Sequence, residues 1–141
     1  PALDLKNQFE NYSLEFEKQE LLYYHLLEDN LISNETKSLE LNDKKIPLNY
    51  NLFKNDALIF KTLESNSLTI LENDKPFLKV NFEDFPSLGI WTKVNAPFLC
   101  IEPWFGYSDT TQSSGNLFDK EGILVLQPKQ IFKSDYTITI L

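Results

Sequence analysis

The chain has 141 residues, of which 42% are hydrophobic and 13% aromatic, so it holds enough apolar material for the core of one domain and disorder is not expected. Its 13 basic residues, all lysines, are outnumbered by 21 acidic residues, which gives a net charge of −8. This charge repels phosphate backbones and the absence of arginine removes bidentate phosphate recognition, so the sequence argues against a nucleic-acid partner.

Alternation of polar and apolar residues dominates the chain and predicts β-strands rather than helices. In chain order, strands are predicted at 12–17, 21–26, 57–60, 68–71, 76–82, 88–91, 123–126 and 136–140, with a further apolar strand that ends at Glu102. Turn-forming residues cluster at 42–44, 72–75 and 113–116, and the polar stretch 109–116 reads as a loop. The pattern therefore predicts one all-β domain over residues 1–141, an antiparallel β-sandwich whose open sheet edges need a covering partner.

Cysteine content and the length of the apolar runs indicate the cellular compartment of the protein. Cys100 is the only cysteine, and its apolar neighbours predict a buried, unreactive thiol in a reducing environment. No apolar run approaches the roughly 18 residues that span a bilayer, and the N-terminus does not resemble a signal peptide, so we expect a cytoplasmic protein with no membrane partner. The sequence has no methionine, so we expect it to be part of a longer protein.

Glu102 is the leading candidate for acid or base chemistry. It closes an apolar strand and is followed directly by Pro103 and Trp104. Apolar neighbours would desolvate the carboxylate, which favours the neutral form and suits general acid or base work near neutral pH. A glutamate at a strand end that simply faces water is the alternative, and from the residues alone it is the favoured one.

Aromatic residues follow Glu102 and could grip the apolar face of a sugar ring. Trp104 and Tyr107 are the candidates for this wall, with core packing as the alternative, whereas Trp91 is expected in the core or at an interface. Asp56 opens an apolar run and reads most simply as a turn cap. His25, the only histidine, lies in an apolar strand and is expected to be structural.

Other chemistry has little support in the residues. No spacing of His, Cys, Asp or Glu suggests a metal site, and no Ser-His-Asp or Cys-His arrangement is visible. A glycine-rich phosphate loop is also missing. The sequence therefore predicts neither a metal nor a cofactor.

Several segments resemble the C-terminal half of the aldose 1-epimerase (galactose mutarotase) family, particularly its LacX-like branch. They are 9–16, 52–60, 85–91 and 96–104, together with Asp109, 120–123 and 136–140. The resemblance implies a β-supersandwich fold and interconversion of the α and β anomers of a hexose. It implies that Glu102 is the base that takes the anomeric proton and, more loosely, that Asp56 binds sugar hydroxyls.

The same resemblance implies that this chain is incomplete as an enzyme. Both family histidines, one of which protonates the ring oxygen, fall in a half that is absent here, and His25 matches neither. The implied partner is the missing N-terminal half, or another copy of the chain, and the chain alone is expected to be inactive. A non-catalytic carbohydrate-binding β-sandwich is the alternative function, and a purely structural or assembly domain is a third, weaker hypothesis.

Overall fold

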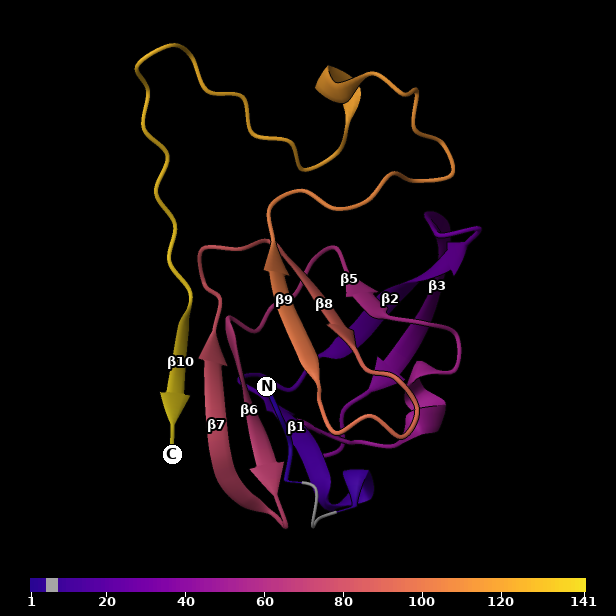
Figure 1. The fold of residues 1–141 in the computed structure, drawn as a ribbon, viewed down its shortest axis with the longest axis vertical. Helices are drawn as coiled ribbons and strands as arrows, with labels where there is room; N and C mark the ends of the chain where they lie inside the picture. The colour runs from indigo at the N-terminus through magenta and orange to yellow at the C-terminus, as the bar shows by residue number, and fades with distance from the viewer. Residues whose placement is uncertain (5–7) are drawn as a thin grey trace.

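Two antiparallel β-sheets pack face to face in the computed structural model, which describes residues 1–4 and 8–141 (Figure 1). Each sheet has five strands. The first has the order β10 (Thr137–Ile140), β7 (Lys75–Asn81), β6 (Ser67–Glu72), β1 (Tyr12–Phe16) and β4 (Lys45–Pro47). The second has the order β3 (Leu31–Glu40), β2 (Leu21–Glu28), β5 (Leu58–Phe60), β8 (Ser87–Trp91) and β9 (Cys100–Trp104). The predicted all-β sandwich is confirmed.

Short 3₁₀ turns supply the remaining regular structure: η1 (Phe9–Asn11), η2 (Tyr50–Phe53) and η3 (Leu117–Asp119). None of the helical turns in the described part of the chain has the length and hydropathy that crossing a bilayer would require.

The core lies between the sheets and follows the alternation of the strands. In β1, Leu14 and Phe16 point inward and are almost fully buried, while the intervening Glu15 is only half-buried. Phe60 of β5 is fully buried at the centre, and its ring contacts the rings of Phe16 and Tyr24 edge-on, each with centroids 6.5 Å apart. The opposite face of the second sheet carries a mixture of polar and apolar residues, among them His25, Ile59 and Glu102.

Most predicted strands are present. Those predicted at 12–17, 21–26, 57–60, 68–71, 76–82, 88–91 and 136–140 correspond to β1, β2, β5, β6, β7, β8 and β10. The predicted turns at 42–44 and 72–75 are confirmed, because Asp43, Lys44, Asn73 and Asp74 all adopt positive φ angles between 49° and 63°. The strands β3 and β4 were not predicted, since β3 is an edge strand with polar residues on both faces and β4 has three residues.

Two strand predictions were wrong. The apolar run 123–126 forms no strand, because it lies in an arm where no other strand runs beside it. The strand predicted to end at Glu102 continues through Pro103 to Trp104, with Pro103 opposite Leu88. Since β9 is an edge strand with one unpaired side, it tolerates the missing N–H of a proline.

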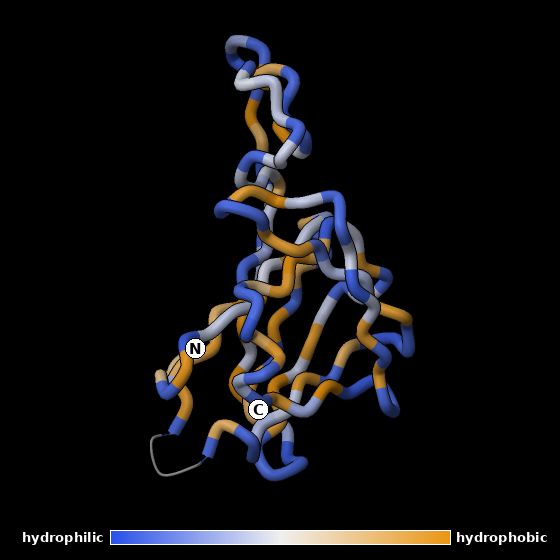
Figure 2. The backbone as a smooth tube through the Cα atoms, turned by 90° about the vertical axis from the view of Figure 1, so that its right-hand side faces the viewer, coloured by the Kyte–Doolittle hydropathy of each residue, from blue (hydrophilic) through white to orange (hydrophobic). Residues whose placement is uncertain are grey.

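The segment 105–136 is this arm. It leaves the top of the sandwich after β9 and then descends as an extended trace to β10, which pairs with β7 in the other sheet (Figure 1). Apolar residues recur along the part that projects from the sandwich (Figure 2). Among them, Val125 is 61% and Ile131 81% exposed. The arm therefore presents apolar surface that nothing in the described chain covers.

Candidate functional site

A row of paired residues crosses the second sheet and carries Glu102 at its edge. Thr36, His25, Ile59, Gly89 and Glu102 stand directly opposite one another on β3, β2, β5, β8 and β9. Paired residues of antiparallel strands share a face, and Leu88 and Ile90, which flank Gly89, are fully buried on the other face. Glu102 thus projects from the face that points away from the core.

Trp91 holds the carboxylate of Glu102. Its indole N–H donates to Glu102 Oε1 over 2.8 Å, and its ring meets that of Phe98 edge-on with centroids 5.5 Å apart. A donor fixed by such packing orients the carboxylate and leaves its second oxygen for another proton donor. Sequence analysis placed Trp91 in the core or at an interface. Its partnership with Glu102 becomes visible only through the register of β8 and β9, in which Trp91 is opposite Cys100.

Trp104 lies flat across Gly89. A Cβ atom at Gly89 would stand 2.5 Å from the Trp104 Cη2 atom and 2.6 Å from Cζ2, so the ring occupies the space that any side chain there would fill. Glycine at this position therefore allows an edge-strand tryptophan to cover the neighbouring strand.

A cavity of about 560 Å³ opens beside these residues. Its lining includes Asp56, Trp91 and Trp104, and its size falls in the range of small-molecule sites, roughly 300–1,000 Å³. Asp56 has a positive φ of 80°, and its Oδ1 accepts from the backbone N–H of Ala57 over 2.7 Å. The structure thus brings Asp56 and Trp104 together, whereas Glu102 does not itself line the cavity and is connected to it by its hydrogen bond to Trp91.

Tyr107 lies apart from this cavity and belongs to a polar cluster at the base of the arm. Its hydroxyl donates to Glu121 Oε2 over 2.7 Å, and Lys61 Nζ contacts the same oxygen at 2.5 Å while lying 5.1 Å from the centre of the Tyr107 ring. Burial, followed by the hydrogen bond and the charge of Glu121, raises the pKa of Tyr107, and the hydrogen bonds from Lys61 and Tyr107 lower the pKa of Glu121. The predicted aromatic wall of Trp104 and Tyr107 is therefore not continuous.

The contacts between Tyr107 and Glu121 lead to a prediction about the titration of Tyr107. We expect Tyr107 to titrate well above the ordinary tyrosine pKa of about 10, and Glu121→Gln to lower its pKa by removing the negative charge. Because the pKa of Tyr107 is higher in the folded than in the unfolded protein, Tyr107 makes its full contribution to the free energy of unfolding below its unfolded-state pKa. This contribution is lost as the pH rises toward the folded-state pKa. NMR titration of the Tyr107 ring carbons in both proteins measures the shift, and identical curves would contradict the contribution assigned to Glu121.

Two further predicted residues have structural partners. His25 Nδ1 lies 2.9 Å from the carbonyl oxygen of Ser33, so Nδ1 carries the proton, and His25 does not line the cavity. Cys100 is half-buried rather than buried, and burial together with Glu102 raises the pKa of its thiol, which keeps it protonated. No group of three or more His, Cys, Asp or Glu residues capable of holding a metal occurs in the described ranges.

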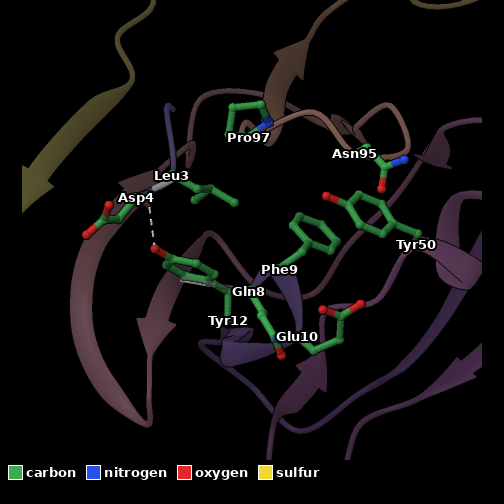
Figure 3. A pocket seen from close by; sticks show the side chains of 9 residues that line it. All are labelled: Leu3, Asp4, Gln8, Phe9, Glu10, Tyr12, Tyr50, Asn95 and Pro97. Carbon is green, nitrogen blue, oxygen red and sulfur yellow. Dashed lines mark hydrogen bonds between the residues drawn. The ribbon is translucent and has the colours of Figure 1, made fainter. Parts of the chain in front are cut away.

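A second cavity, of about 520 Å³, is lined by the N-terminal residues, by Tyr50 of η2 and by Asn95 and Pro97, and contains none of the predicted site residues (Figure 3). Phe9 and Tyr50 stack there with ring centroids 4.5 Å apart. The Tyr12 hydroxyl accepts from the backbone N–H of Asp4 over 3.1 Å and donates to Glu72. These contacts attach the N-terminal residues to the first sheet, so the side chains that line this cavity have a structural role.

Comparison with known proteins supports the resemblance inferred from the sequence. The chain is 36% identical over 140 residues to the plasmid-encoded LacX protein of Lactococcus lactis subsp. lactis, and the same holds for the chromosomal LacX protein. It also superimposes on a galactose mutarotase related enzyme from Lactobacillus acidophilus with a TM-score of 0.85 and 27% identity, over 98% of this chain and 47% of that one. The chain is a homologue of the LacX proteins and has the fold of galactose mutarotase-like proteins.

Other comparisons agree with this mutarotase-like fold. A galactose mutarotase-like protein from Lactobacillus casei matches 97% of the chain and 48% of its own with a TM-score of 0.75, at 19% identity. No family model matches the sequence. The LacX alignments cover 95% of this chain and 46% of the relatives, so the chain spans about half the length of the curated relatives it matches.

Gly89 provides a direct test of the geometry of this candidate site. We expect Gly89→Ala to displace the Trp104 ring and to cost about 1–3 kcal/mol through overpacking, seen as a shift of the Trp104 indole N–H signal in NMR spectra. Gly106→Ala is the matched control, because its Cβ would meet no atom closer than 3.6 Å. An unmoved Trp104 signal in Gly89→Ala would contradict the close approach.

Proposed function

We propose that this chain contributes the general base, Glu102, to a site that interconverts the α and β anomers of a hexose. The observation that carries the proposal is the Trp91–Glu102 hydrogen bond of 2.8 Å beside a cavity lined by Asp56 and Trp104. A fixed carboxylate, a sugar-sized cavity and tryptophan surfaces together match the needs of acid–base chemistry on a sugar ring.

Each group has a defined role in this reaction. Glu102 takes the proton of the anomeric hydroxyl while an acid protonates the ring oxygen, and the bond between the anomeric carbon and the ring oxygen breaks. The aldehyde rotates and the ring closes on its other face, with both protons returned. Trp104 supports the apolar face of the ring and Asp56 accepts hydrogen bonds from hydroxyls. The steps require only proton transfer, so no cofactor enters the proposal.

The acid is supplied by residues outside this chain. His25 is bound to the Ser33 carbonyl and does not line the cavity. We therefore assign the chain to the C-terminal part of a larger β-domain whose N-terminal half completes the site. Its span of 46% of the LacX relatives and the uncovered apolar arm support this assignment. The single half-buried thiol fits action in the cytoplasm.

Polarimetry tests the function. The complete protein, meaning this chain joined to the half that its relatives possess, is expected to accelerate the optical rotation change of freshly dissolved α-glucose or α-galactose above the spontaneous rate. The 141-residue chain alone is expected to be slower by about 10²–10⁴-fold, because it lacks the acid. A complete protein that does not accelerate the change of any hexose would refute the proposal.

A carbohydrate-binding module is the second candidate, since two tryptophans line one cavity. Isothermal titration calorimetry separates the two functions. Hexose binding by the complete protein without any anomer interconversion would favour the binding module over the epimerase.

A further inference from the structure

Two lysines enter the cavity from separate loops. Lys54 directly follows the η2 turn, and Lys93 follows β8 by two residues. Because β5 and β8 are antiparallel, with Leu58 opposite Ile90, the segment before β5 and the segment after β8 lie at the same end of the sheet. The lysines therefore approach the cavity from that end.

The charge of the cavity lining is opposite to that of the chain. Its charged members are Lys54, Lys93 and Asp56, so two positive charges and one negative give +1, against −8 for the whole chain. Neither lysine is in an ion pair, since the ion pairs within the described residues are Lys61–Glu121 and Lys120–Asp109. An acidic protein thus holds two unpaired ammonium groups at this cavity, where a ligand can meet both.

The register places these ammonium groups away from Glu102. Glu102 lies opposite Gly89, and Trp91 lies two residues, about 6.7 Å, further toward the lysine end of β8. Lys93 lies beyond Trp91. A sugar whose anomeric hydroxyl meets Glu102 and whose ring extends along β8 past Trp91 would bring its far end to the lysines.

We propose that the substrate is an aldose with an anionic group remote from the anomeric carbon, a phosphate or a carboxylate, which Lys54 and Lys93 bind. This inference rests on the proposed function for the placement of the anomeric end. Lysine binds phosphate as a point charge, so the absence of arginine from the chain does not exclude such a ligand. The carboxylate of Glu102 disfavours an anion at its own end of the site, whereas at the other end the two lysines outnumber the carboxylate of Asp56, which gives the ligand one orientation.

Kinetics with three sugars test the substrate class. We would measure kcat/KM of the complete protein for glucose, glucose 6-phosphate and glucuronate by exchange NMR, corrected for the spontaneous rate. We expect at least one anionic sugar to exceed glucose by about tenfold or more. In Lys54→Gln/Lys93→Gln this ratio should fall toward one, whereas Lys75→Gln/Lys79→Gln, which makes the same charge change on β7, should keep it.

The outcomes separate the two proposals. A lysine-dependent preference for glucose 6-phosphate or for glucuronate supports the inference and identifies the anionic group. Turnover of glucose with no anionic preference, or with a preference that the double variant retains, overturns the inference and leaves the epimerase proposal in place. If no sugar is turned over, calorimetry with the same proteins decides. Anionic-sugar binding that the double variant loses supports the lysine site, and its absence overturns it.

Discussion

Glu102→Gln is expected to lower the anomer interconversion rate of the complete protein by about 10²–10⁴-fold, the usual contribution of a positioned general base. Glutamine has nearly the same shape, and its amide oxygen can still accept the Trp91 indole N–H that now bonds to Oε1 over 2.8 Å. The amide cannot take up the anomeric proton. We therefore expect kcat to fall while calorimetric sugar affinity changes little.

Glu83→Gln serves as the control for this substitution, because it makes the same chemical change at an exposed position between β7 and β8. Its kinetics should match those of the unsubstituted protein. Unchanged interconversion in Glu102→Gln would remove Glu102 from the mechanism. Equal losses of kcat and of sugar affinity would instead indicate that the substitution disturbs the cavity.

Phe60→Ala is expected to destabilise the fold by about 3–5 kcal/mol, the cost of emptying a fully buried aromatic site. Phe60 lies in β5, and its ring joins those of Phe16 in one sheet and Tyr24 in the other. The cavity created there sits directly beneath Ile59, which lines the functional cavity from the same strand. Stability and sugar affinity should therefore fall together.

Denaturant unfolding measures this effect as a lower midpoint with an unchanged slope. Val94→Ala, at a loop position that is 67% exposed, should change the free energy of unfolding by less than about 0.5 kcal/mol. A loss below about 1 kcal/mol for Phe60→Ala would show that neighbouring side chains fill the space.

Alternation predicted the strands that use one face for the core, because burial on that face leaves a period of two in the sequence. This explains the success at β1 and the omission of β3, whose middle residues are exposed on both faces, whereas β6 is buried on both faces and was predicted from an apolar run between turns. The apolar run 123–126, which forms no strand, shows that an apolar sequence alone does not suffice. Apolar residues make a strand only where another strand can pair with them, and the arm offers none.

The candidate site was only partly predictable for a related reason. Glu102 attracted attention through its immediate neighbours, but Trp91 and Gly89 contribute through cross-strand register, which a linear pattern does not contain. The grouping of Asp56 with Trp104 depends on how the loop after η2 meets the second sheet. Tyr107 was grouped with Trp104 by proximity in sequence, yet the chain turns into the arm between them and brings Tyr107 to Glu121.

The contact between Gly89 and Trp104 makes the volumes at these two positions complementary. The indole of Trp104 covers a part of the sheet surface that two medium-sized side chains, one at each position, could otherwise cover. The two positions should therefore change together during evolution, so that homologues with a side chain at the position of Gly89 carry a small residue at that of Trp104. Such exchanges would reshape the wall of the cavity without altering the backbone, which offers the family a simple route to different sugar preferences.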